Sequence, residues 1–184
     1  MNMSPFLSFF LVSALIASAV EDLRFAKIPN LITFPTMATG ILYHSVLSGL
    51  DGLLYSVGGL GLGVCLLLFP YVMGKMGAGD AKLMGAAGSI VGLKGIFIAF
   101  LITSVVAGVY ACIVLVVNRR YLAGRVRRYS LMVKTFVLTR QVVYYRPSGS
   151  EKSPAIRYGV AVAVGTTVYT VLEYVGYDFT NFGM

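Results

Sequence analysis

The sequence predicts an all-α membrane protein: a polytopic bundle of about six transmembrane helices that forms a single domain over residues 1–184. Three observations predict it. Of the 184 residues, 58% are hydrophobic and 12% charged, whereas ordinary soluble domains carry about 25% charged residues. The apolar residues form runs about long enough to cross a bilayer. The net charge of +8 lies in the gaps between these runs, which is typical of membrane topology and not of nucleic-acid binding.

The apolar runs define the expected spans. In chain order they cover about 4–20, 31–49, 53–73, 81–93, 95–117 and 158–175. A secretory signal has a positively charged residue before its apolar run. No Lys or Arg precedes the first run of this chain. We therefore expect an uncleaved first span, in spite of the small residues Ala17-Ser18-Ala19. The fourth run is short for a full span, and we expect it to be tilted or to begin inside the protein.

Several small or polar residues within the runs have simple expected roles. The third run contains a small-residue face that favours close helix packing, formed by Gly58, Gly59, Gly61 and Gly63. His44 has no carboxylate or cysteine at ligand spacing, so we expect it to pack or to lie at the interface. Cys65 and Cys112 lie in separate runs without CxxC spacing. This pattern favours buried apolar side chains over a disulfide or a zinc site.

Residues 118–157 differ in character, because most of the Lys and Arg residues of the chain fall there. Within this segment, 129–145 is apolar but is interrupted by Lys134 and Arg140. A central basic residue costs a span about 2.5–3.5 kcal/mol. We therefore expect an interfacial amphipathic segment that binds anionic lipid, with a seventh span as the alternative. Direct contact with a substrate or with secretion machinery is a second alternative for its function.

The distribution of positive charge predicts the orientation. Six spans place the gaps at 21–30, 74–82 and 118–157 on one face, and these gaps hold every Lys and Arg except Lys94. Positive residues stay on the cytoplasmic side of a membrane. This face is therefore expected to be cytoplasmic, with the N-terminus outside.

Two aspartates lie on this face: Asp22 follows the first span, and Asp80 precedes the fourth. Ionisable residues at the edge of apolar spans are costly and often functional. Two adjacent carboxylates tend to share a proton, and such a pair can activate a water molecule for hydrolysis. Gly77 and Gly79 flank this site and would allow backbone torsions and a close approach that side chains block.

A structural role for the same residues is the alternative. Asp80 could cap the fourth helix, because a carboxylate at a helix N-terminus is favourable. Asp22 could be an interfacial charge that is balanced by Arg24 or Lys27. Spacing alone does not choose between these roles and catalysis.

The exact residues favour catalysis. Asp22-Leu23-Arg24 is followed by Ile28-Pro29-Asn30, and later by Gly77-Ala78-Gly79-Asp80-Ala81-Lys82-Leu83. Together they resemble the type IV prepilin peptidase family, the GxGD intramembrane aspartic proteases of the prepilin and preflagellin branch, over roughly residues 1–120. The resemblance implies that Asp22 and Asp80 are catalytic and that no metal or organic cofactor takes part. It makes Gly77, Gly79, Lys82, Pro29 and Asn30 supporting motif positions, with an electrostatic role for Lys82.

The resemblance also implies a reaction. Members of the family remove the short basic leader of prepilin-like or preflagellin precursors at the cytoplasmic face of the cell membrane. Larger members carry an N-methyltransferase region between the first spans, where this chain has only residues 21–30. We therefore expect peptidase activity without methylation. The alternatives are a small transporter or proton-coupled channel, which two acids at one membrane face disfavour, and a non-catalytic pilus assembly factor.

Overall fold

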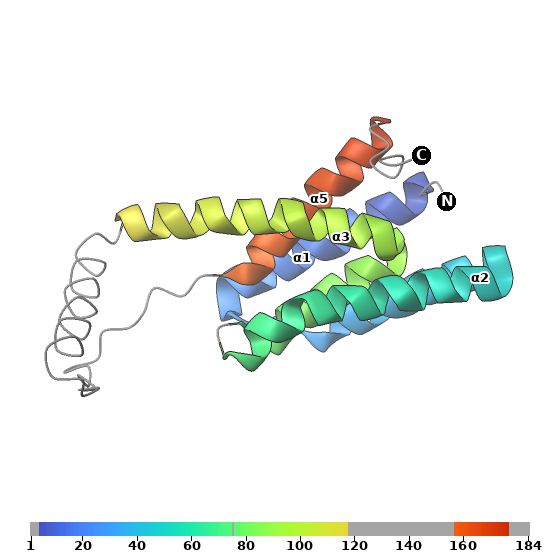
Figure 1. Ribbon diagram of the computed structural model, residues 1–184, viewed down its shortest axis with the longest axis horizontal. Coiled ribbons are helices and arrows are strands. Elements are labelled where there is room, and N and C mark those ends of the chain that lie inside the picture. The colour runs from blue at the N-terminus through green and yellow to red at the C-terminus, as the bar shows by residue number, and fades with distance from the viewer. Residues whose placement is uncertain (1–3, 75, 118–156, 177–184) are drawn as a thin grey trace, which may run out of the picture. The chain divides into compact units, whose positions relative to one another are not determined.

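A computed structural model describes residues 4–74, 76–117 and 157–176. All regular secondary structure within these ranges is helical: α1 (Pro5–Phe25), α2 (Asn30–Val72), α3 (Ala78–Val117) and α5 (Tyr158–Tyr174) (Figure 1). The helices α1, α2 and α3 are each long and apolar enough to cross a membrane. The predicted polytopic helical membrane protein is therefore confirmed.

The chain divides into two compact units, one formed by Met1–Ala107 with Arg157–Met184 and the other by Gly108–Ile156. Every contact described below lies within the first unit. In the second unit, the described residues continue α3 as far as Val117. The basic residues between 118 and 156, with the expected amphipathic segment at 129–145, lie outside the described residues.

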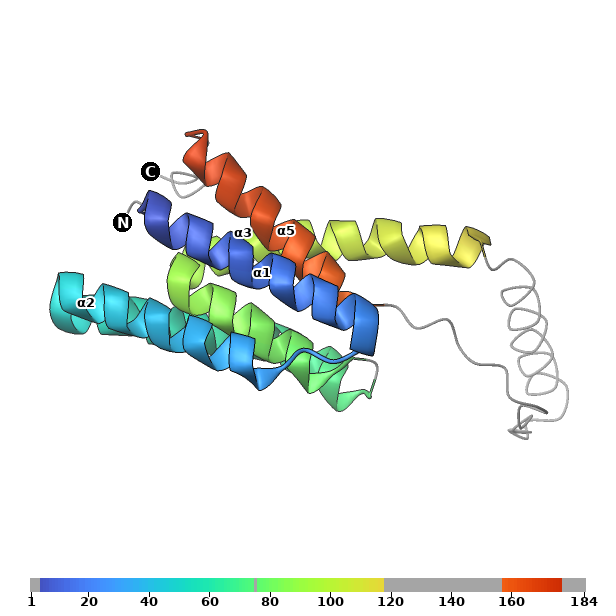
Figure 2. The ribbon, with the colours of Figure 1, turned by 180° about the vertical axis from the view of Figure 1, so that it is seen from behind.

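Two glycines turn α2 and α3 back on themselves. Gly49 has φ 57° and Gly92 has φ 74°, and each interrupts the helical torsions. Glycine adopts positive φ without the steric cost that a Cβ atom imposes. The result is four segments, 30–48, 50–72, 78–91 and 93–117, whose limits lie within a few residues of the predicted spans. The hairpin of α2 is visible in Figures 1 and 2.

The first helix is longer than expected. It begins at a Ser4 cap, whose hydroxyl accepts a hydrogen bond from the Leu7 amide at 3.3 Å, and it continues past the predicted end near residue 20. It ends at Ala26, which has φ 53° and donates its N–H to the Asp22 carbonyl at 3.0 Å. Asp22 therefore lies in the last turn of α1 and not in a loop. Charged residues at 21–24 have adequate helix propensity, so the loss of hydrophobicity does not end the helix.

Close approach between α2 and α3 depends on glycines one helical turn apart. A Cβ atom at Gly59 would lie 2.1 Å from the Gly88 carbonyl oxygen, and one at Gly63 would lie 2.5 Å from the Met84 carbonyl oxygen. Such contacts allow the backbones to pack closely where lipid provides no hydrophobic driving force. The predicted small-residue face included Gly61, but a Cβ atom at Gly61 would face open space. The packed face therefore contains fewer glycines than predicted.

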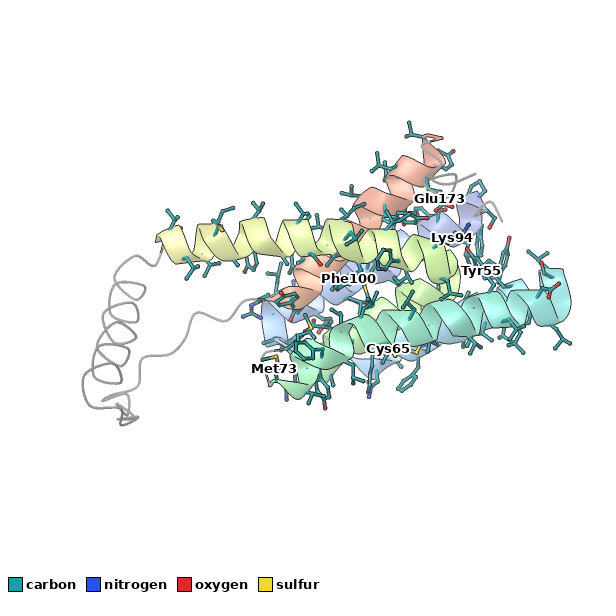
Figure 3. All side chains as sticks on the ribbon, in the orientation of Figure 1. Tyr55, Cys65, Met73, Lys94, Phe100 and Glu173 are labelled. Carbon is teal, nitrogen blue, oxygen red and sulfur yellow. The ribbon has the colours of Figure 1, made fainter. Side chains whose placement is uncertain are left out.

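Polar side chains of α2 cap the end of the first segment of α3. Because the helix is interrupted at Gly92, nearby carbonyl groups lose their intrahelical partners. His44 Nε2 lies 3.0 Å from the Ile90 oxygen, and the Tyr55 hydroxyl donates to the Val91 oxygen at 2.6 Å. Figure 3 labels Tyr55 at this end of the helices. His44 therefore packs inside the protein, which is one of the two roles predicted for it.

The side of α1 that packs against the rest of the unit carries Leu7, Leu11 and Leu15, all buried. Helix α5 packs beside α1, as Figure 2 shows. The prediction that Cys65 and Cys112 are buried is wrong, because both are free and exposed. Outward faces of a membrane bundle are as apolar as its interior, since lipid contacts them. An apolar run therefore does not predict which side is buried.

Candidate active site

Asp22 is placed by the last turn of α1 and is 7% exposed. Its main-chain oxygen accepts two hydrogen bonds, one from the Ala26 amide and one from the Arg157 guanidinium. Its side-chain Oδ2 is buried and has no hydrogen-bond partner among the described residues. A buried carboxylate oxygen without a partner is costly, and such unsatisfied groups often have a catalytic role.

Asp80 lies in the first turn of α3 and is 8% exposed. Its Oδ2 accepts a hydrogen bond from the Gly77 amide at 3.2 Å, and its own amide donates to the Gly77 oxygen at 3.2 Å. This reciprocal pair has the form of a capping box, in which a carboxylate reaches back to the start of the helix. Asp80 therefore does cap α3, as the structural alternative stated, and the cap fixes the orientation of its carboxyl group.

The two carboxyl groups are close enough to interact, since the charge of Asp22 acts on Asp80. Ile28, in the loop between α1 and α2, joins their surroundings. A Cβ atom at Gly79 would lie 3.0 Å from Ile28 Cβ, and one at Gly159 would lie 3.0 Å from Ile28 Cδ1. Both side chains are buried, with exposed fractions of 7% for Asp22 and 8% for Asp80. Such a pair contains both a general base and a general acid.

Lys82 connects the start of α3 to the start of α2. Its Nζ donates a hydrogen bond to Asn30 Oδ1 at 3.0 Å and lies 5.4 Å from the centre of the Phe34 ring. Pro29 immediately precedes α2 with extended torsions, φ −70° and ψ 138°. These contacts hold the loop that carries Ile28 against Gly79 at the start of α3. Lys82, Pro29 and Asn30 therefore act together on the shape of the site.

The two glycines of the Gly77–Asp80 sequence differ in their surroundings. Neither has a positive φ, so special torsions do not explain either of them. A Cβ atom at Gly79 would crowd Ile28, at 3.0 Å from its Cβ and 3.4 Å from its amide nitrogen. The nearest atom to a Cβ at Gly77 would be Asp80 Oδ2 at 3.5 Å, an ordinary contact. Close approach therefore requires glycine at position 79 only.

Three residues of the site were not predicted: Ile28, Arg157 and Gly159. Ile28 belongs to a sequence singled out for its proline and asparagine, and no polar group marked it. Arg157 and Gly159 are far from Asp22 in the sequence, and their spacing gives no signal of contact. Within residues 4–74, 76–117 and 157–176, no group of three or more His, Cys, Asp or Glu residues could hold a metal ion.

The fold and the site define a class of protein: a polytopic helical membrane protein with two interacting carboxyl groups where the ends of two helices meet. The chain belongs to the type IV leader peptidase family, since the model of that family matches residues 9–112, more than half of the sequence. The match includes both aspartates and ends before α5.

A curated relative is the prepilin leader peptidase/N-methyltransferase of Xanthomonas campestris pv. campestris. It is 37% identical over 107 residues, a match that covers 54% of this chain and 37% of the relative. The aligned part of the chain thus spans little more than a third of the length of that protein. No solved structure matches the chain.

Proposed function

We propose that this protein is an aspartic endopeptidase that removes the leader peptide from prepilin-like or preflagellin precursors. The observation that carries the proposal is that Asp22 and Asp80, both buried, share Ile28 in their surroundings: Ile28 meets Gly79, next to Asp80, and Gly159, which faces the Asp22 carboxyl group. Both aspartates lie within the region that matches a family of leader peptidases. The relative named as a prepilin leader peptidase supports the choice of substrate class.

The two carboxyl groups have different surroundings and can act differently in the reaction. Asp80 is held by the Gly77 amide, whereas Asp22 Oδ2 has no hydrogen-bond partner among the described residues. The ionised carboxylate takes a proton from the water as its oxygen attacks the scissile carbonyl carbon. The protonated carboxyl group donates a hydrogen bond to the carbonyl oxygen. The C–N bond then breaks, and a proton passes to the leaving amine.

We further propose that the site opens to the cytoplasm. Arg24, Lys27 and Lys82 lie near the two aspartates in the sequence, and basic residues are retained on the cytoplasmic side. The basic residues of 118–157 would add contacts with anionic lipid on the same side. A membrane-impermeant thiol reagent should therefore reach Lys27→Cys in inverted vesicles and not in intact cells. The reverse pattern would contradict the orientation.

The proposed activity is proteolysis without methyl transfer. The relative combines both activities in its name, and the aligned part of this chain spans 37% of its length. Only residues 26–29 separate α1 from α2, so the described chain has no inserted domain between these helices. Mass spectrometry of the mature substrate should find an unmodified N-terminal amine.

Cleavage of a co-expressed pilin precursor, scored as a gel shift, tests the proposal. Asp22→Asn and Asp80→Asn should each abolish processing, because each removes one ionisable member of the pair while preserving its size. Asp51→Asn is the matched control, since it also alters an aspartate but lies beside the Gly49 turn of α2. All three variants should insert and accumulate normally. Cleavage by either site variant at the wild-type rate would contradict the aspartic mechanism, and no cleavage by the wild-type protein would favour a non-catalytic assembly factor.

A further inference from the structure

We propose that the start of α5, residues 157–159, is a positioning element for Asp22, an inference that rests on the proposed function. It comes from the part of the chain beyond the family match at 9–112. Two independent contacts carry it. One is made by Gly159 with the carboxyl group of Asp22, and the other by Arg157 with its main-chain oxygen.

Gly159 provides the space that the Asp22 side chain occupies. A Cβ atom at Gly159 would lie 2.8 Å from Asp22 Oδ2 and 3.0 Å from Asp22 Cγ. Gly159 is itself buried and has no positive φ, so the need for space is the reason for glycine here. The same Cβ atom would also meet Ile28 Cδ1 at 3.0 Å. An alanine at this position would push the carboxyl group away from its place beside Asp80.

Arg157 fixes the backbone from which that side chain projects. Its guanidinium donates to the Asp22 carbonyl oxygen, which is one of the last carbonyl groups of α1. A cation at the C-terminus of a helix is favourable, because the unpaired carbonyl groups there carry partial negative charge. Arg157 also occupies the N-cap position, immediately before α5 begins at Tyr158. The contact therefore holds the end of α1 and the start of α5 in a fixed relation at the site.

These contacts predict a defect in the chemical step and not in substrate binding. The carboxyl group that Gly159 and Arg157 place acts on water and on the reacting carbonyl, so its displacement affects the chemical step. A displacement of about 1 Å can lower a rate by about 100-fold. Gly159→Ala should lower kcat by about 10- to 100-fold and change KM by less than about 3-fold.

Gly165→Ala is the matched control for folding. Gly165 is also a buried glycine of α5, and a Cβ atom there would lie 2.3 Å from Thr103 Oγ1, away from both carboxyl groups. Rates are normalised to the amount of inserted protein. Gly165→Ala should then retain the wild-type kcat, although less protein accumulates. Wild-type kcat in Gly159→Ala, or an equal fall in kcat in both variants, would overturn the inference.

Conservative replacements test Arg157 separately. Arg157→Lys keeps a cationic donor and should retain kcat within about 3-fold, whereas Arg157→Ala should lose about 10-fold or more, again with little change in KM. Equal kcat values for Arg157→Ala and wild type would overturn the role of Arg157. Asp22→Asn and Asp80→Asn are measured in the same membranes. If they too remain active, the proposed function fails; if they are inactive while the α5 variants behave as wild type, only this inference fails.

Discussion

At the scale of single residues, the site depends on how closely backbone segments approach the two carboxyl groups. Gly79 and Gly159 each face Ile28 at about the same separation, 3.0 Å to a hypothetical Cβ atom. Ile28 thus lies between an α3 residue next to Asp80 and an α5 residue that contacts Asp22. A residue that carries no reactive group therefore packs against the backbone next to both acids.

Gly77→Ala and Gly79→Ala should differ in effect, although both change a motif glycine. At Gly79 the added methyl group meets the backbone and Cβ of Ile28, so the loop must move and cleavage should fall by about 10-fold or more. At Gly77 the methyl group makes an ordinary contact, and activity should stay within about 3-fold of wild type. Initial cleavage rates per inserted protein provide the measurement. Equal losses in the two variants would contradict the role assigned to Ile28.

The sequence predicts that Asp22 and Asp80 lie on one membrane face, because the Lys and Arg residues concentrate in the gaps that would share that face. It could not predict the contacts of Arg157 and Gly159. Arg157 lies 135 residues from Asp22, and packing between distant helices leaves no periodic pattern in either of them. The role of Asp80 as a helix cap could be predicted, since local spacing determines capping.

At the scale of helices, the arrangement is set by glycines that either bend the chain or let two helices touch. Gly49 and Gly92 bend it, with positive φ. Gly59 and Gly88 let α2 and α3 touch, because a Cβ atom on either one would lie 2.1 Å from the carbonyl oxygen of the other. Gly61, only two residues from Gly59, points into open space.

Gly59→Ala should therefore destabilise the protein, whereas Gly61→Ala should not. Overpacking at Gly59 should lower the free energy of unfolding by about 1–3 kcal/mol. At Gly61 the better helix propensity of alanine should leave stability unchanged or raise it by about 0.5–1 kcal/mol. Thermal unfolding of the purified protein in detergent measures both. A destabilised Gly61→Ala, or an unaffected Gly59→Ala, would show that the helices do not approach as described.

The predicted spans agree closely with the helical segments because long apolar runs are strong signals of transmembrane helices. The end of α1 was missed, since hydrophobicity marks the bilayer edge while the helix continues to the Ala26 cap. The exposure of Cys65 and Cys112 was missed for a related reason: lipid-facing and buried positions have the same polarity.

At the scale of the whole molecule, the fold brings together residues from three helices and one loop at a single site. Asp22 comes from α1, Asp80 from α3, Gly159 from α5 and Ile28 from the loop after α1. The region that matches the family model contains Asp22 of α1 and Asp80 of α3 but not α5. The central claim is that the two carboxyl groups are neighbours, because every proposal about catalysis depends on that pairing.

Cross-linking in membranes tests this claim most directly. Asp22→Cys and Asp80→Cys are combined in a protein whose two native cysteines, which are exposed and free, are replaced by serine. The reference pair is Asn30→Cys with Lys82→Cys, because Lys82 Nζ and Asn30 Oδ1 are 3.0 Å apart. A short bifunctional thiol reagent should join positions 22 and 80 within one chain as efficiently as it joins this reference pair. If the reagent joins only this reference pair and leaves positions 22 and 80 separate, the paired-carboxylate site is wrong.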